Sequence, residues 1–250
     1  MSGVRIRFVV HGSVRDAITS TCSLTGKSND SLGERPRPRR PGRCGFTLKL
    51  DRSFYGRPTL QVASDLIGKV LVRRYKGRNL AGKIIETEAY IGPLDLACHA
   101  SKGKTARTSV MFGPPGFSYV YMIYGFYFCL NVVTESEGFP AAVLIRAVEP
   151  LENIQVMRRL RSRPRTDTNI ASGPGKLCMA MSIDKRLNAA DMTGTSLWIE
   201  DRSVPPGPIE TGPRIGVDYA GEYKDKPWRF LERGNPHVSH FRRKAYEIPT

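Results

Sequence analysis

Two acidic side chains and a tyrosine alternate with apolar or small residues in the segment 84–90. In a β-strand, Glu86, Glu88 and Tyr90 project from one face and the residues between them project from the other. Carboxylates beside an aromatic ring are suited to acid–base chemistry on a planar ligand. A solvated sheet face gives the same pattern, so this spacing alone leaves both interpretations open.

A second cluster is aromatic and lies within residues 119–128. Most such clusters belong to a core, but a buried tyrosine hydroxyl needs a partner, and many tyrosines together suit a surface that stacks on planar ligands. One of them, Tyr124, directly precedes Gly125, the expected tip of a turn, where an exposed ring is suited to wedging between base pairs. The cluster comprises Tyr119, Tyr121, Tyr124, Phe126, Tyr127 and Phe128.

Three further polar residues complete the set of candidates. His99 taken alone is more typical of a structural histidine than of an acid or a ligand. Asn131 and Arg146 are each embedded in an otherwise apolar segment. A polar side chain in that position is costly unless it is hydrogen-bonded, so a structural network or a ligand site is indicated.

The charge of the chain indicates a polyanionic partner. The 250 residues include 39 Lys and Arg against 23 Asp and Glu, a formal net charge of +16. Neutralisation of phosphates with release of counterions drives binding of such proteins to nucleic acid. Ribosomal proteins and proteins that bind anionic membranes share this balance, so charge alone does not select the partner.

The first 45 residues differ in composition from the rest. They are rich in Ser, Thr and Arg and end in a segment with prolines at positions 36, 38 and 41, which predicts a disordered basic tail. This tail contains nine basic and three acidic residues, so residues 46–250 keep 30 basic and 20 acidic side chains and are basic in their own right. A DNA-tethering arm, a targeting segment and a translation start placed too far upstream all fit residues 1–45.

The cysteines and the hydropathy exclude several classes of protein. The five cysteines are odd in number and widely spaced, with no close pair typical of a zinc site or a redox dithiol, so free thiols in a reducing compartment are expected. No apolar run has the length of a membrane-spanning helix, and the apolar patch at residues 8–10 is too short for a signal peptide. We therefore expect an intracellular protein without a metal site, in the cytoplasm or nucleoid, or in the nucleus of a eukaryote.

The periodicity of the body predicts an α+β fold. Poor alternation of strands with helices favours a single domain over residues 46–250, with a curved, mainly antiparallel β-sheet flanked by helices. The expected helices cover residues 59–67, capped by Thr59, then 150–162, and a short segment after Pro174. The expected strands cover residues 70–75 and 80–90, joined by a turn at 76–79, then 119–124, 126–133, 141–148, 197–200 and 214–219.

Together these residues resemble a known family. The segments Glu-Thr-Glu-Ala-Tyr at 86–90, Tyr-Val-Tyr-Met-Ile-Tyr-Gly at 119–125, Arg-Ala-Val-Glu-Pro at 146–150 and Ser-Gly-Pro-Gly-Lys-Leu-Cys at 172–178, with His99 and Asn131, resemble the 3-methyladenine (alkyladenine) DNA glycosylase family. The likeness extends from about residue 54 to 233, in order and without large gaps. It implies a monomeric enzyme without a cofactor that binds double-stranded DNA, flips out alkylated or deaminated purines and hydrolyses their N-glycosidic bond, initiating base excision repair.

The resemblance also implies the catalytic residues. Glu88 corresponds to the general base that deprotonates the attacking water, and Arg146 corresponds to an arginine beside that water. Hydrolysis through an oxocarbenium-like state needs only one carboxylate when the leaving base is cationic. No lysine occupies a matched pocket position to form a Schiff base, which favours simple hydrolysis by a monofunctional enzyme.

The other matched positions imply contacts with DNA. Tyr90, His99 and Tyr121 correspond to the residues that stack on and contact the flipped base. Asn131 corresponds to the residue that disfavours the exocyclic amine of normal guanine. Tyr124 corresponds to the side chain that fills the gap left in the duplex.

Other classes of function fit the sequence less well. A zinc-dependent nucleobase deaminase needs a His-x-Glu and a Pro-Cys-x-x-Cys motif, and neither occurs. The segment 173–176 superficially suggests a phosphate loop, but it lacks the earlier glycine and has Leu177 where Ser or Thr would hold magnesium. A non-catalytic module that binds damaged DNA or RNA on the same scaffold stays open, although Glu88 argues against it.

Overall fold

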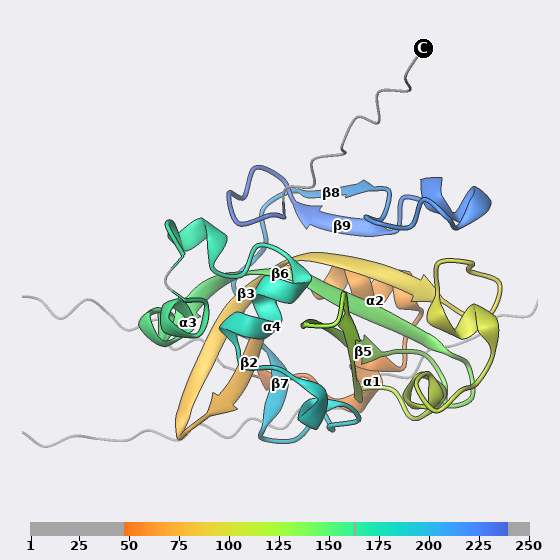
Figure 1. Ribbon diagram of the computed structural model, residues 1–250, viewed down its shortest axis with the longest axis horizontal. Helices are drawn as coiled ribbons and strands as arrows, with labels where there is room; N and C mark the ends of the chain where they lie inside the picture. Colours follow the sequence, from red (N-terminus) through yellow and green to blue (C-terminus); the bar gives the residue numbers. More distant parts are fainter. Residues whose placement is uncertain (1–47, 163, 240–250) are drawn as a thin grey trace, which may run out of the picture. The chain divides into compact units, whose positions relative to one another are not determined.

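The structure, a computed structural model, describes residues 48–162 and 164–239 (Figure 1). The predicted disordered tail over residues 1–45 lies outside these residues. The described part has an α+β fold in which nine strands form one sheet, and all pairings between these strands are antiparallel. The predicted fold class is therefore confirmed.

The sheet brings segments together that are far apart in the sequence. Its main path runs in the order β1 (Leu48–Lys49), β7 (Leu197–Asp201), β2 (Val70–Tyr75), β3 (Arg78–Ile91), β6 (Ala141–Glu152), β5 (Tyr127–Val133) and β4 (Ser118–Ile123). Off this path, β8 (Ile209–Gly212) pairs with β9 (Arg229–Glu232), and β9 pairs with β3.

Strand β3 holds the acidic segment and is the centre of the sheet. It pairs with β6 along most of its length, while its other edge pairs first with β2 and then, at residues 86–88, with β9. The register with β6 is irregular on both sides of Glu86. Such irregularities re-aim side chains, and here they occur where the strand carries its two buried carboxylates.

In the described part of the chain, four short α-helices flank the sheet. They are α1 (Arg52–Tyr55), α2 (Thr59–Asp65), α3 (Ile154–Leu160) and α4 (Pro174–Ala180). Helix α2 packs on β3 and β6, and α4 packs on β5 and β6. The hydroxyl of Thr87 donates to the carbonyl of Ala63 in α2 at 2.8 Å, so the residue between the two acids faces this helix. Leu66, Ile84 and Leu177 are fully buried in the main apolar core.

The hairpin of β4 and β5 ends in a tight turn. Tyr124 has φ = 52° and Gly125 has φ = 78°. The amide of Phe126 donates to the carbonyl of Ile123 at 3.3 Å. Two positive φ angles are the signature of a type I′ turn, in which glycine is favoured and a tyrosine is uncommon. The Tyr124 side chain is 82% exposed, so its predicted place at the turn tip is confirmed.

Two predictions about helices were wrong. Thr59 does not cap α2: it is the first helical residue, and its hydroxyl instead bonds Glu135 and Thr134. The helix expected over residues 150–162 is only α3, because β6 continues to Glu152. Pro150 stays in β6 and pairs with Gly82 of β3. The other edge of β6 has no partner strand at Pro150, so the missing amide hydrogen of the proline leaves no strand hydrogen bond unmade there.

The strand predicted over residues 214–219 is a loop. Gly216 has φ = 77°, and Arg214 turns inward to an ion pair instead of alternating along a sheet. The late strands are instead β8 and β9, which the sequence analysis did not predict. Both are four residues long, and neither has the regular apolar alternation of an amphipathic strand.

Candidate active site

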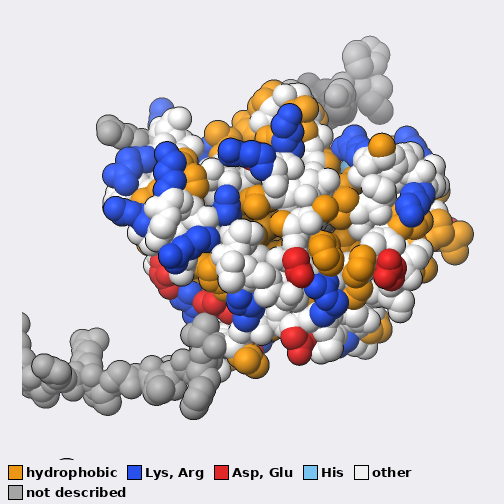
Figure 2. All heavy atoms as spheres, turned by 90° about the horizontal axis from the view of Figure 1, so that it is seen from below, with side chains coloured by type: hydrophobic (Ala, Val, Ile, Leu, Met, Phe, Trp, Pro, Cys, Tyr) orange, Lys and Arg blue, Asp and Glu red, His pale blue; other side chains and the backbone are white. Residues whose placement is uncertain are grey.

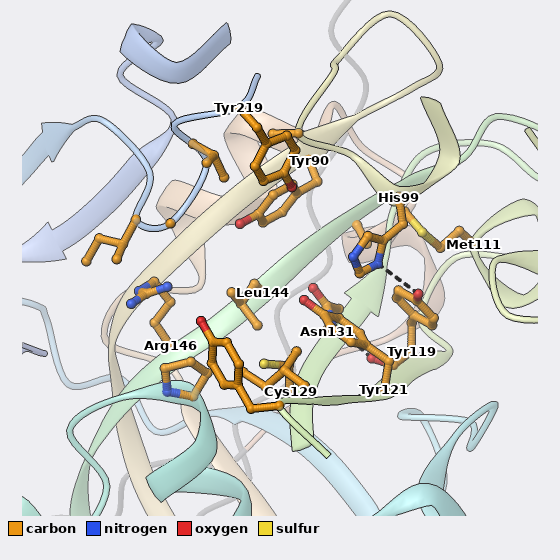
Figure 3. Close-up of a pocket in the computed structure, with 18 residues that line it drawn as sticks. Tyr90, His99, Met111, Tyr119, Tyr121, Cys129, Asn131, Leu144, Arg146 and Tyr219 are labelled. Atoms are coloured by element: carbon orange, nitrogen blue, oxygen red, sulfur yellow. Dashed lines mark hydrogen bonds between the residues drawn. The ribbon is translucent and has the colours of Figure 1, made fainter. Parts of the chain in front are cut away.

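A cavity of about 350 Å³ opens between β3, the β4–β5 hairpin, β6 and the loop 214–219 (Figure 3). This volume lies in the range of small-molecule sites. Its wall is mainly aromatic, with the rings of Tyr90 and Tyr219 near each other at one side and those of His99 and Tyr121 at another. The lining includes six of the seven predicted site residues: Tyr90, His99, Tyr121, Tyr124, Asn131 and Arg146.

The seventh predicted residue, Glu88, lies directly behind the cavity wall. Its carboxylate is fully buried and accepts hydrogen bonds from the Tyr90 hydroxyl at 2.9 Å, from Nη1 of Arg146 at 3.1 Å and from the amide of Ile215 at 2.7 Å. All three donors line the cavity. A carboxylate accepts about four hydrogen bonds, so one acceptor position of Glu88 has no donor among the described residues.

Glu86 is also fully buried, but most of its hydrogen-bond partners lie outside the cavity wall. It receives Nε of Arg146 at 3.2 Å, Nε of Arg229 at 2.7 Å, and the hydroxyl and amide of Ser239, each at 2.9 Å. Three of these bonds end on Oε1 and one ends on Oε2, and neither Arg229 nor Ser239 lines the cavity. Glu88, not Glu86, is therefore the acid whose partners among the described residues all line the cavity.

Arg146 links the two acids from the middle of β6. Burial alone lowers the pKa of its guanidinium, but the Glu88 and Glu86 carboxylates more than offset this and hold the pKa above its ordinary value. A buried ion pair of this kind needs all of its hydrogen bonds to be made. Arg146 is thus a fixed cation that orients Glu88 at the cavity wall.

Tyr119 fixes the orientation of the aromatic wall. Its hydroxyl lies 3.0 Å from Nδ1 of His99, the contact drawn in Figure 3, and its carbonyl accepts from the Asn131 amide at 3.1 Å. The ring of Tyr121 packs edge-on against His99 with centroids 4.6 Å apart. These contacts hold the rings before any ligand binds, which lowers the entropy lost on binding.

His99 is expected to stay neutral at pH values well below the ordinary pKa of histidine. Burial lowers its pKa from 6.5 to about 4, and the charges of Arg107 and Lys102 act in the same direction. The unfolded chain therefore binds this proton more readily, so the contribution of His99 to stability falls as the pH decreases from 6.5 to about 4. Titration of the ring signals by NMR measures this pKa, and a midpoint near 6.5 would contradict the burial argument.

Three residues important to the site were not found from sequence: Asp95, Arg214 and Ile215. The ion pair of Asp95 and Arg214 is fully buried, with nitrogen–oxygen distances of 2.5 and 2.8 Å. Arg214 also packs its guanidinium over the ring of Tyr90 at 4.8 Å, and the next residue supplies the amide that binds Glu88. The sequence does show a charged residue, Arg214, at the start of an apolar segment. Its acidic partner Asp95 lies 119 residues away, so the ion pair could not be predicted from neighbouring residues.

Three further findings concern possible metal ligands, the cysteines and the helices of the described residues. Residues 48–162 and 164–239 contain no group of three or more His, Cys, Asp or Glu side chains placed to bind a metal ion. Cys98, Cys129 and Cys178 are free and buried. No helix in the described part is both long enough and apolar enough to span a membrane.

One face of the molecule carries many more Lys and Arg side chains than Asp and Glu side chains (Figure 2). Apolar side chains are exposed between these cations on the same face. Apolar side chains are also exposed at the β4–β5 hairpin, where Met122 is 50%, Tyr124 82% and Phe126 65% accessible. Exposed cations are suited to phosphates, and exposed aromatic rings are suited to planar bases.

Comparison with known proteins finds one matching family model and many similar proteins. Residues 53–236 match the family model described as methylpurine-DNA glycosylase. A protein of Methanocella arvoryzae is 57% identical over 195 residues, which are 76% of this chain and 95% of that protein. Proteins of Alkaliphilus oremlandii and Legionella pneumophila are 52% and 48% identical and cover 77% and 76% of this chain and 99% and 98% of their own length. All three are described as "Putative 3-methyladenine DNA glycosylase".

Proposed function

The chain belongs to the methylpurine-DNA glycosylase family, and we propose that it is a monofunctional enzyme that hydrolyses the N-glycosidic bond of alkylated or deaminated purines flipped out of duplex DNA. The resemblance found in the sequence is thereby confirmed at the level of the family. The flipped substrate, the hydrolytic mechanism and the monomeric state are the parts proposed here.

The observation that carries the proposal is the environment of Glu88. Its carboxylate is bound only by groups that line the aromatic cavity, and one acceptor position has no donor among the described residues. A water molecule at that position would be hydrogen-bonded to a fixed carboxylate beside the bound nucleotide. Placement of this kind is the main requirement for a general base.

The reaction then proceeds with balanced bonds and charges. The bond between the base nitrogen and C1′ breaks and its electron pair leaves with the base. A cationic alkylpurine thereby becomes a neutral molecule, and a neutral deaminated purine leaves as an anion that takes up a proton from solvent. The developing positive charge on the sugar is stabilised by the nearby carboxylate. The water oxygen bonds to C1′ and its proton passes to Glu88, so the products are a free base and an abasic site.

The cavity wall favours a flipped purine as substrate. Tyr90, His99 and Tyr121 supply rings around a space suited to a planar base. A neutral His99 offers one nitrogen to Tyr119 and leaves the other for the base edge. Alkylated purines stack weakly and leave readily, so they cost less to extrude than normal bases.

The proposal is tested by measuring free base released from duplexes that contain 3-methyladenine, 7-methylguanine, hypoxanthine or ethenoadenine. Release of at least one of these bases, with an abasic strand as the other product, is expected. The competing function is a non-catalytic module that binds damaged DNA or RNA. Tight binding to a lesion without base release would favour that module and contradict the enzyme.

We expect Tyr124→Ser to weaken the flipped complex while the free energy of unfolding stays nearly unchanged. The ring is 82% exposed at the turn tip, so its removal leaves no cavity in the core. In the complex, an inserted ring offsets an unstacking cost of a few kcal/mol. The measurement is the fluorescence of a base analogue placed beside the lesion, alongside thermal unfolding of the same variant.

A structural role for Tyr124 makes the opposite forecast. Truncation of a large core side chain costs roughly 3–5 kcal/mol of stability. A badly destabilised Tyr124→Ser protein that flips bases normally would therefore contradict the wedge. Exposed Phe126, in the same turn, provides the matched control in Phe126→Ser, which removes a neighbouring ring that does not line the cavity.

A further inference from the structure

A second cavity adjoins the aromatic one. It has a volume of about 350 Å³, and His99 and Tyr219 line both cavities and so stand between them. Its other lining residues come from the segment 96–108 around His99: Leu96, Cys98, Ser101, Lys102, Thr105, Arg107 and Thr108. Neither Glu88 nor Arg146 lines this second cavity, so the hydrolytic chemistry proposed above does not use it.

The cations of this cavity are available to a ligand. Lys102 and Arg107 have exposed side chains, and neither forms an ion pair with any carboxylate in residues 48–162 and 164–239. Both lower the pKa of His99, so their positive field reaches the wall between the two cavities. An anionic oxygen group in this cavity would meet two unpaired charges.

The segment that holds these cations is ordered by its own hydrogen bonds. The Thr108 hydroxyl donates to the carbonyl of Gly103 at 3.0 Å and accepts from the amide of Thr105 at 2.8 Å. The amide of Thr108 donates in return to the Thr105 hydroxyl at 3.2 Å. Lys102 and Arg107 therefore flank a fixed loop, which reduces the entropy lost when a ligand is bound.

The same segment contacts the hairpin that carries the proposed wedge. The guanidinium of Arg107 lies 5.1 Å from the centre of the Tyr121 ring, and its Nη2 is 3.5 Å from the carbonyl of Met122. The cavity thus lies beside both the aromatic pocket and the β4–β5 turn. A nucleotide whose base enters the pocket brings its own backbone phosphates to this neighbourhood.

The arginines near α3 are weaker candidates for phosphate contacts, although the sequence presents five of them between residues 158 and 165. Arg158 forms an ion pair with Asp167. Arg161 donates from Nε to the carbonyl of Ile170 at 2.9 Å. Arg163 lies outside the described residues. These internal partners compete with any phosphate, whereas Lys102 and Arg107 form no ion pair with a carboxylate of the described residues.

We propose that the second cavity binds a backbone phosphate of the DNA strand that carries the flipped nucleotide, with Lys102 and Arg107 as its charged ligands. This inference rests on the proposed function, because the flipped base is what brings the strand to the cavity. It names a phosphodiester as the ligand and assigns it to a separate site from the base. The phosphate then anchors the strand while the aromatic cavity holds the base.

The test measures binding of the full-length protein to a duplex with a tetrahydrofuran abasic analogue, which needs no base release. Affinity is followed against salt concentration for wild type, Lys102→Ala and Arg107→Ala. Loss of one phosphate contact reduces the slope of log affinity against log salt by about one. The corresponding loss of affinity is about eightfold at about 0.1 M salt, from a slope near 0.9 per phosphate. Lys76→Ala removes an exposed lysine at the β2–β3 turn that lines neither cavity, and it is expected to keep the wild-type slope.

Neutral methylphosphonates, placed one at a time in the lesion strand, identify the phosphate. At one position beside the analogue, wild type is expected to lose affinity while Lys102→Ala loses no more, because the two changes remove the same contact. Equal slopes for wild type, Lys102→Ala and Arg107→Ala would overturn the phosphate site. The phosphate site would also be overturned if the losses of affinity from Lys102→Ala and from a methylphosphonate were additive at every position of the strand. Failure of the proposed function registers separately, as absence of base release from lesion duplexes by the wild-type protein.

Discussion

Glu88→Gln is expected to bind lesion-containing duplex as tightly as wild type but to release the base at least about a hundredfold more slowly, the usual contribution of a general base. The amide oxygen can still accept from the Ile215 amide and Arg146 keeps its ion pair with Glu86, although the new NH2 group cannot accept the bonds that Tyr90 and Arg146 donate to Glu88. It cannot take a proton from water, and it no longer stabilises positive charge on the sugar. The variant is therefore expected to lose base release while it keeps its affinity for the duplex.

Single-turnover base release with enzyme in excess measures the chemical step, and lesion-duplex affinity measures binding. Glu86→Gln is the matched control, because it also removes one buried charge that pairs with Arg146. Glu86 binds Arg229 and Ser239, which do not line the cavity, so its substitution is expected to reduce stability more than the chemical rate. Near-normal turnover in Glu88→Gln together with loss in Glu86→Gln would reverse the assignment.

Asp95→Ala is expected to lower the free energy of unfolding by about 3–5 kcal/mol, the usual cost of leaving one partner of a buried ion pair alone. Asp95 accepts two bonds from Arg214 and also binds the amides of Ile91 and Ala97. Removal of its carboxylate leaves the Arg214 charge buried beside Tyr90. Denaturant unfolding of the two proteins measures the difference.

A surface ion pair provides the control for this prediction. Asp65 pairs with Arg57, and the two side chains are 50% and 36% exposed, so Asp65→Ala is expected to cost no more than about 1 kcal/mol. Combining Asp95→Leu with Arg214→Met removes both buried charges and should recover much of the lost stability. Equal small losses in Asp95→Ala and Asp65→Ala would contradict the role given to the buried pair.

The residues that sequence could place are those governed by local periodicity. Glu86, Glu88 and Tyr90 alternate along β3, and because β3 is a strand, all three side chains reach the same hydrogen-bonded network around Arg146. Tyr124 was placed at a turn by the glycine that follows it, since a type I′ turn needs positive φ at both central residues. In both cases the determining neighbours lie within a few positions in the chain.

The parts that sequence could not place depend on distant partners. The segment beginning at Arg214 has the composition of a strand, yet Asp95 draws its first side chain inward and Gly216 breaks the extended backbone. Pro150 resembles a helix start, but pairing with β3 keeps it in a strand. Tertiary contacts across many residues overrode local preference in each case.

The partners of Glu86 have a consequence for how the chain matures. Arg146 lies 60 residues after it, Arg229 lies 143 after it and Ser239 lies 153 after it. Contacts of such separation close large loops and form slowly. During synthesis, Glu86, Glu88 and Arg146 leave the ribosome before Arg229, so two carboxylates first share one guanidinium. The second guanidinium that pairs with Glu86 is in place only when β9 joins β3, so the charge balance of this network depends on a strand that leaves the ribosome late.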